Sequence, residues 1–171
     1  MSHDTGLLRV LIDRLAIEEL LDRYLAGLDE AEFDDTWARS IFTEDGRFEF
    51  PVGGHAGVTG MAGFTAAMMG KWRRTHHLGA CHLVELDGDL ARVRGNLIAT
   101  HLHPQSPPPE QLPRGRAPEP FQVGDRFEGE ARRTDAGWRF ARLAFEVVWS
   151  RGTPPGHLDT HHSQGAPTCG S

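Results

Sequence analysis

Cysteine is scarce in this chain: there are 2 cysteines, Cys81 and Cys169, among 171 residues. Two cysteines cannot build the disulfide framework that stabilises many small secreted domains. Cys81 falls in an expected strand, where it fits a small buried hydrophobe, and Cys169 lies close to the end of the sequence. This cysteine usage favours a reducing cytoplasm as the location of the protein.

Long apolar runs and an excess of positive charge are also missing. No segment approaches the roughly 20 consecutive apolar residues that cross a bilayer, and acids and arginines interrupt the first apolar stretch, unlike a secretory signal. Acidic residues outnumber basic ones, 24 to 18, for a formal net charge of −6. Nucleic acids and anionic membranes both require a basic surface. We therefore expect neither as a partner.

What the chain does contain is enough apolar material, 39% of 171 residues, for one domain with a core. Apolar residues recur every three or four positions over 17–28, 33–41 and about 59–73, which predicts three helices. A short alternating strand, Arg47–Phe50, separates the last two helices and follows the turn signal Asp45-Gly46.

The pattern changes to strand-like alternation after the third helix. Strands are predicted over 77–86, 91–103, 125–133 and 138–149, with turns at Asp87-Gly88-Asp89 and Asp135-Ala136-Gly137. The Pro-rich segment 104–120 is long for a connection between paired strands, and such loops often act as lids. Residues 151–171 contain few large apolar side chains, which predicts a flexible tail.

Helices that are segregated from an antiparallel sheet define an α+β fold. We predict three N-terminal helices packed on a curved antiparallel sheet that encloses a pocket, because a twisted sheet curling over a helix leaves a concave apolar space. Residues 1–150 would form this domain, with 104–120 as a loop or lid.

Several local motifs resemble the SnoaL-like branch of the nuclear-transport-factor-2-like superfamily. They are Asp22–Asp29, Trp37 with Ile41–Gly46, Thr75–Gly79, Asp87–Ala91 and Ala136–Phe140. The resemblance covers about 11–149 and implies a cone-shaped, cystatin-like fold. This fold hosts dehydratases, isomerases, cyclases and non-catalytic subunits.

Within the superfamily, the chain is most similar to scytalone-dehydratase-like and bile-acid-dehydratase-like enzymes. This similarity implies catalytic roles for Tyr24, Asp29, His77 and His101. The chain departs from these relatives at Leu28 and Phe127, where the scytalone type has tyrosine and asparagine, and near Val147, where the bile-acid type has arginine. It also lacks carboxylates at the positions that match the bases of steroid isomerases. The substrate of neither relative can therefore be transferred to this chain.

The implied set suits the elimination of water beside a carbonyl. Tyr24 would stabilise the enolate, His77, oriented by Asp29, would remove the α-proton, and His101 would protonate the departing hydroxyl, or the two histidines would exchange these roles. An apolar wall would accept a flat aromatic or polycyclic, polyketide-like metabolite. Its candidate members are Phe48, Phe50, Phe64, Met68, Trp72, Phe145, Val147 and Trp149.

Other functions fit the same residues. An isomerisation or a cyclisation also passes through an enolate, a non-catalytic small subunit of a ring-hydroxylating dioxygenase shares the fold, and the histidines could merely bind a ligand. His101 and His103 with His77 could instead hold a metal, but no matched carboxylate accompanies them. We therefore expect no metal and no cofactor. The superfamily resemblance implies a homodimer, with a homotrimer as the alternative.

Overall fold

The structure, a computed structural model, describes residues 2–51, 53–112, 114 and 119–155. Cys169 and most of the predicted tail lie outside these residues, as does the side chain of Cys81. In the part of the chain that is described, no helix is long and apolar enough to cross a membrane.

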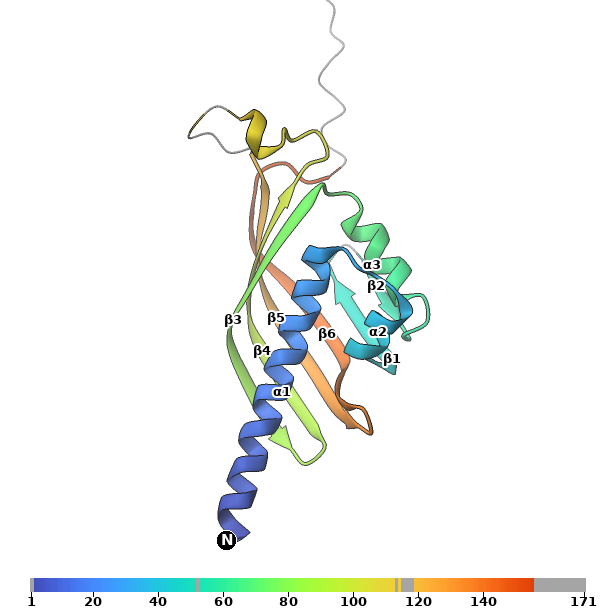
Figure 1. Cartoon of the computed structure of the whole chain (residues 1–171), viewed down its shortest axis with the longest axis vertical. Coiled ribbons are helices and arrows are strands. Elements are labelled where there is room, and N and C mark those ends of the chain that lie inside the picture. The colour runs from blue at the N-terminus through green and yellow to red at the C-terminus, as the bar shows by residue number, and fades with distance from the viewer. Residues whose placement is uncertain (1, 52, 113, 115–118, 156–171) are drawn as a thin grey trace, which may run out of the picture.

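The three helices form where apolar periodicity predicts them, with different ends. Helix α1 (Ser2–Glu30) buries the predicted face from Ile17 to Leu28, and its first turns project beyond the sheet (Figure 1). Helix α2 (Asp35–Ile41) begins at Asp34, whose carboxylate accepts a hydrogen bond from the Trp37 N–H at 2.6 Å. Helix α3 (Met61–Met69) is shorter than predicted because Gly70 ends it before the turn that leads into the sheet.

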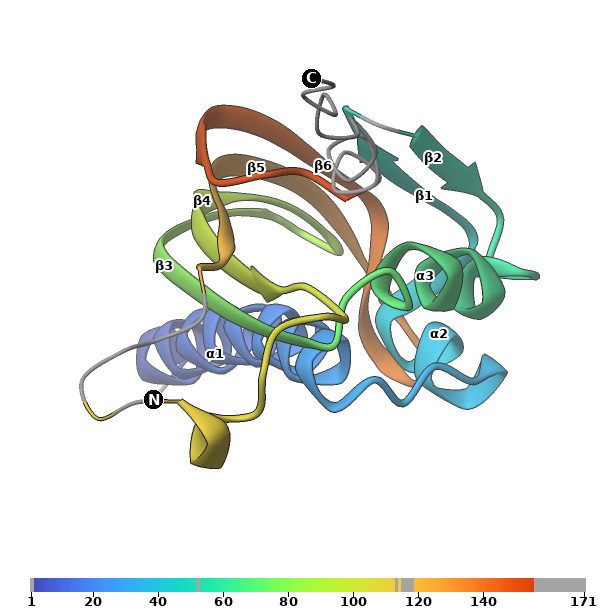
Figure 2. The same ribbon diagram turned by 90° about the horizontal axis from the view of Figure 1, so that it is seen from above.

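Six strands form one sheet in the order β2-β1-β6-β5-β4-β3. They are β1 (Phe42–Phe50), β2 (Gly53–Ala56), β3 (Arg74–Asp87), β4 (Leu90–Leu102), β5 (Phe121–Thr134) and β6 (Gly137–Arg151). The strands from β3 to β6 follow one another as antiparallel neighbours, as predicted. Figure 2 shows the sheet curling around α1, with α2 and α3 at one side.

Two features of the sheet differ from the prediction. Strand β1 pairs with β6 in parallel, so the sheet is mixed rather than wholly antiparallel. After β1, the chain forms β2 and α3 and then enters β3 at the opposite edge of the sheet. From there each strand pairs with the next in antiparallel fashion as far as β6, which lies beside β1 and runs in the same direction. Strand β2 was not predicted, because its sequence, Gly53-Gly54-His55-Ala56, has no apolar alternation.

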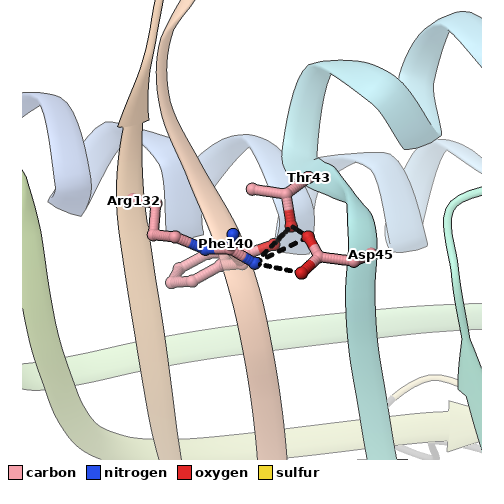
Figure 3. A network of polar contacts seen from close by, with 4 residues as sticks. All are labelled: Thr43, Asp45, Arg132 and Phe140. Atoms are coloured by element: carbon pink, nitrogen blue, oxygen red, sulfur yellow. Dashed lines mark hydrogen bonds and ion pairs between the residues drawn. The ribbon is translucent and has the colours of Figure 1, made fainter.

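The turn signal Asp45-Gly46 proves to be an irregularity inside β1, where the register with β6 shifts between Phe42 and Arg47. Figure 3 shows the polar contacts that fix this stretch: both carboxylate oxygens of Asp45 accept hydrogen bonds from the Arg132 guanidinium at 2.6 Å, and the Thr43 hydroxyl donates to Asp45 at 2.9 Å. Arg132, followed by Thr43, lowers the pKa of Asp45 to about 2. These contacts fasten the start of β1 to the β5–β6 hairpin.

Candidate active site

A cavity of about 250 Å³ lies between the inner face of the sheet and the helices, on the side of the molecule where α1 ends and β3 begins. Its wall is mostly apolar. Six of the predicted wall residues line it, namely Phe48, Phe50, Met68, Trp72, Phe145 and Val147, together with Tyr24, His77 and His101. Sequence reasoning did not anticipate Leu97, Val123, Lys71 or Asp125 in the wall, nor Pro154 and Pro155, which it assigned to the flexible tail.

Two predicted wall residues lie elsewhere. Phe64 packs behind the wall, edge-on to Phe48 with ring centroids 6.1 Å apart. Trp149 lies on the opposite face of the sheet, because the register between β5 and β6 shifts at Gly124 and Asp125 and leaves Val148 as an extra residue. Its indole covers Gly124, where a Cβ atom would lie 2.1 Å from the indole nitrogen. Only glycine permits this close approach.

His77 lines the cavity and makes a short polar contact with Asp29, which is not itself one of the lining residues. The Nδ1 atom of His77 lies 2.6 Å from one oxygen of Asp29, and the backbone N–H of His77 donates to the other oxygen at 2.9 Å. The Thr75 hydroxyl also donates to Asp29, at 2.8 Å. Asp29 ends α1 and His77 lies near the start of β3, so the two elements meet through this carboxylate. The sequence resemblance predicted this pairing of residues 48 apart.

Burial raises the pKa of Asp29, but the hydrogen bonds from His77 and Thr75 outweigh that effect and hold the pKa below its ordinary value. The carboxylate therefore stays ionised near neutrality. It accepts a hydrogen bond from the Nδ1–H group of His77, which leaves the Nε2 lone pair of His77 free to accept a proton.

His101 stands beside His77, with ring centroids 5.5 Å apart and ring planes at 86°. The rings of Trp72 and Phe121 flank His101 at 4.7 Å and 6.1 Å. Burial, and then the proximity of His77, lower the pKa of His101 to about 4. Its Nδ1 atom is buried and has no hydrogen-bond partner among the described residues. His101 is therefore a neutral imidazole at neutral pH, with one ring nitrogen available to a ligand.

Tyr24 enters the cavity wall from α1 within a group of aromatic rings. Trp37, Phe42, Phe48 and Phe145 lie with ring centroids 6.1–6.3 Å from the Tyr24 ring. Burial raises the pKa of the phenol far above its ordinary value of 10.0. The hydroxyl therefore keeps its proton and can only donate or accept a hydrogen bond as a neutral group.

Asp125 is a buried ionisable residue of this cavity that the sequence reasoning missed. It was placed at the start of a strand, but β5 already begins at Phe121. Asp125 lies between the inward-facing Val123 and Phe127, and this single acid within an apolar alternating face is the signal that could have identified it. Burial raises the pKa of Asp125 to about 6.

The alternative of a metal site finds no support in the geometry. Among the described residues, no three side chains of His, Cys, Asp or Glu converge to hold an ion. His103 is buried against Trp72, with ring centroids 5.2 Å apart.

Comparison with known proteins identifies a domain family. The sequence profile of the SnoaL-like domain matches residues 9–144. No curated protein sequence matches the chain.

Solved structures share the fold. Protein Kfla4162 from Kribbella flavida is 26% identical, with a TM-score of 0.69 over 83% of this chain and 95% of that one. A protein from Novosphingobium aromaticivorans DSM 12444, provisionally described as a scytalone dehydratase, is 20% identical, with a TM-score of 0.68 over 88% and 91% of the two chains. A type 2 hexachlorocyclohexane dehydrochlorinase is also 20% identical, with a TM-score of 0.69 over 87% and 98%.

Proposed function

Since the chain belongs to the SnoaL-like domain family and has its cystatin-like fold, we propose that it is a cofactor-independent dehydratase that eliminates water beside a carbonyl. Solved structures of the same fold include a provisionally described dehydratase and a dehydrochlorinase, which supports a small-molecule-processing enzyme. The proposed substrate is a small aromatic or polycyclic, polyketide-like metabolite, because aromatic and aliphatic side chains make up most of the wall.

The observation that carries this proposal is the Asp29–His77 pair. The short Nδ1 contact of 2.6 Å orients the imidazole, and the buried His77 ring lines an apolar cavity. A surface ion pair would not need a second hydrogen bond from the histidine backbone and a third from Thr75 to the same carboxylate. Such fixed orientation is what a general base requires.

In the proposed reaction, Nε2 of His77 takes the α-proton of a β-hydroxyketone while Tyr24 donates a hydrogen bond to the developing enolate oxygen. The enolate then expels the β-hydroxyl, whose C–O bond breaks. Protonated His77 returns the proton to the leaving oxygen, so that one water forms and the enzyme is unchanged. His101 is assigned a hydrogen bond to the substrate through its Nδ1, unpartnered among the described residues, as a neutral imidazole, since its pKa is lowered to about 4, in place of the charged acid role expected from the sequence.

The test is turnover of an aromatic β-hydroxyketone, followed by absorbance as the conjugated product forms. His77→Ala should lower kcat by about 10²–10⁴-fold, the usual contribution of a general acid–base group, while KM changes little. Asp29→Asn should cost less, because the base remains but loses its orientation. His76→Ala is the matched control, since His76 is the exposed neighbour of His77 on the same strand; it should retain wild-type turnover.

The identity of the product separates this proposal from its alternatives. A dehydratase releases a product lighter by one water, whereas an isomerase or cyclase working through the same enolate retains the oxygen. The buried acid Asp125 favours isomerisation as the second candidate, since it offers a second proton-transfer group. If His77→Ala and His101→Ala both turn over at the wild-type rate, the roles proposed for the two histidines are wrong; a wild-type protein that never turns over such substrates supports the scaffolding role instead.

A further inference from the structure

No described residue is a hydrogen-bond partner that would explain the burial of Asp125. It is 4% exposed, and its Cα lies opposite Leu97 of β4 and Val147 of β6, both apolar. Its Oδ1 atom is buried and makes no hydrogen bond with any described residue. A buried polar group without a hydrogen-bond partner destabilises a folded protein. Asp125 lines the cavity, from which a bound molecule can supply a partner.

The surroundings of Asp125 favour its neutral form. The other titratable groups that line the cavity are Tyr24 from α1, Lys71 from the α3–β3 connection, His77 from β3 and His101 from β4. Lys71 is exposed, so its charge is screened by solvent. Because burial raises the pKa of Asp125 to about 6, the side chain below that pH is a carboxylic acid that can both donate and accept a hydrogen bond.

Strand register separates Asp125 from the Asp29–His77 pair. His77 lies opposite Ala99, which lies opposite Val123, and Asp125 is two residues further along β5. Two strand spacings and two residue rises place the Cα atoms of His77 and Asp125 roughly 12 Å apart on a flat sheet. Both side chains line the same cavity. The cavity thus has two polar ends joined by an apolar wall.

We propose that Asp125 is a substrate-binding residue, whose carboxyl hydrogen-bonds a neutral hydroxyl or carbonyl oxygen on the part of a flat apolar molecule remote from His77. This assignment rests on the proposed function, because it takes the cavity to be the substrate site, and it narrows the substrate class. A suitable molecule carries two oxygen functions separated by about a fused ring system and has no carboxylate at the Asp125 end. A carboxylate there would face a second acid, and the like charges would repel.

Binding of three flat probes tests this assignment without any turnover. Equilibrium dialysis would compare 2-naphthol, naphthalene and 2-naphthoate. At about pH 5, where Asp125 holds its proton, wild-type protein should bind 2-naphthol about tenfold more tightly than naphthalene, as a single well-placed hydrogen bond allows. Asp125→Leu should remove this preference and leave naphthalene affinity intact. An unchanged preference in Asp125→Leu overturns the proposal.

A second variant keeps the test decisive even if Asp125→Leu does not fold. Asp125→Asn preserves the hydrogen bond and abolishes ionisation. Wild-type affinity for 2-naphthoate should fall about tenfold between about pH 5 and pH 8, as Asp125 ionises, whereas affinity in Asp125→Asn should change much less. Equal pH dependence in the two proteins overturns the proposal.

The outcome is independent of the dehydratase assay. His77→Ala should keep the preference for 2-naphthol over naphthalene, because His77 is not the group that reads this oxygen. A wild-type protein that shows the preference but never turns over a hydroxyketone contradicts the proposed function alone. An active enzyme in which Asp125→Leu retains the preference contradicts the assignment of Asp125 alone.

Discussion

Burial acts in opposite directions on two ionisable side chains that line the same cavity. It raises the pKa of Asp125 to about 6, and together with the nearby His77 it lowers the pKa of His101 to about 4. Between these two values the carboxyl is protonated and the imidazole is not. Both groups are therefore neutral at mildly acidic pH, although the wall around them is largely apolar.

The two groups contribute to stability with opposite pH dependence. Folded Asp125 holds its proton more tightly than an ordinary aspartate with a pKa of 3.8, so its favourable contribution is complete below that pH and is lost as pH rises through about 6. Folded His101 holds its proton less tightly than an ordinary histidine with a pKa of 6.5. Its contribution is present above that pH and is lost as pH falls toward about 4.

Replacing Asp125 by asparagine should therefore make the protein progressively more stable than wild type as pH rises. A shift of about two pKa units corresponds to on the order of 2–3 kcal/mol between pH 4 and pH 8. Urea unfolding at several pH values measures this difference in the free energy of unfolding between the variant and the wild type. His101→Gln should instead improve relative stability on the acidic side. Parallel wild-type and Asp125→Asn profiles would show that Asp125 titrates normally in the folded protein.

At this scale, strand and helix periodicity predicted much of the site. Tyr24 lies on the apolar face of a clear helix, and His101 shares one face of its strand with Leu97 and Ala99, so each was expected to point inward. Trp149 does not point inward as predicted, because one extra residue in β6 reverses the inward–outward alternation beyond it. No local pattern marks such a bulge. Asp125 was missed for a different reason: the start of its strand was placed too late.

At the scale of elements, Asp13 joins the middle of α1 to the ends of two hairpins. Its carboxylate accepts hydrogen bonds from Arg133 at 2.6 Å and from the Trp138 indole at 3.2 Å, and Arg133 also reaches Asp89 at 2.8 Å. The Arg133 guanidinium lies 4.5 Å from the centre of the Trp138 ring. The hydrogen bond from Arg133 leads the effects that hold the pKa of Asp13 below its ordinary value, despite burial.

Asp13→Ala should lower the free energy of unfolding by about 2–4 kcal/mol, because it leaves Arg133 and the buried indole N–H short of a partner. Asp22→Ala, which removes an exposed acid from the same helix, is the control and should change stability little. The stabilisation by Asp13 should also be lost as pH falls through its depressed pKa. Denaturant titrations of both variants check these outcomes; equal losses would mean that Asp13 is not an anchor.

The segments next to the cavity need a separate test. The Pro-rich loop is tied to the start of β3 by a hydrogen bond from Arg73 to the Ser106 carbonyl at 2.5 Å, while Pro154 and Pro155, beyond β6, line the cavity itself. Deleting residues 105–118 should leave the melting temperature nearly unchanged and weaken substrate affinity, as expected of a lid. Truncation after Thr153 should also weaken affinity, because it removes part of the wall. A large loss of stability on loop deletion would contradict the lid role.

Element order could be predicted, but the pairing of β1 could not. Alternation predicted the strands from β3 to β6, and the short turns at 87–89 and 135–137 predicted that β3 pairs with β4 and β5 with β6. The neighbours Phe48 and Leu143 lie on strands far apart in the chain. Their parallel pairing depends on the path through α3 and across the sheet, which local periodicity does not encode.

At the scale of the whole molecule, the outer face of the sheet carries an apolar row across four strands. Leu78 of β3 lies opposite Ile98 of β4, Ile98 lies opposite Gly124 of β5, and Gly124 lies opposite Trp149 of β6, whose indole covers it. Leu78, Ile98 and Trp149 are 56%, 44% and 44% exposed. Polar residues, including Thr100 and Asn96, lie on either side of this row. Such a bordered apolar strip is typical of a subunit contact.

We expect the protein to form a homodimer through this row, with a homotrimer as the alternative. Sedimentation velocity at micromolar concentration should give the mass of an assembly, and the double variant Leu78→Glu/Ile98→Glu should sediment as a monomer. The projecting first turns of α1 also expose leucines, so Leu7→Glu/Leu11→Glu serves as the comparison variant. If only the Leu7→Glu/Leu11→Glu variant dissociates, the subunit contact lies on α1 and not on the sheet. A monomeric wild type would exclude both.

The contact between Asp29 and the His77 backbone has a consequence beyond chemistry. Strand β3 is an edge of the sheet, and an edge strand offers unpaired N–H groups as a template on which another chain can add a strand. Asp29 occupies one of these donors at 2.9 Å, in place of a neighbouring strand. The carboxylate that orients the proposed base therefore also pairs a backbone N–H group that could otherwise bind a strand of another chain, which opposes aggregation. A variant without a hydrogen-bond acceptor at position 29 would leave this N–H group unpaired at the sheet edge, so it should aggregate more readily as well as lose activity.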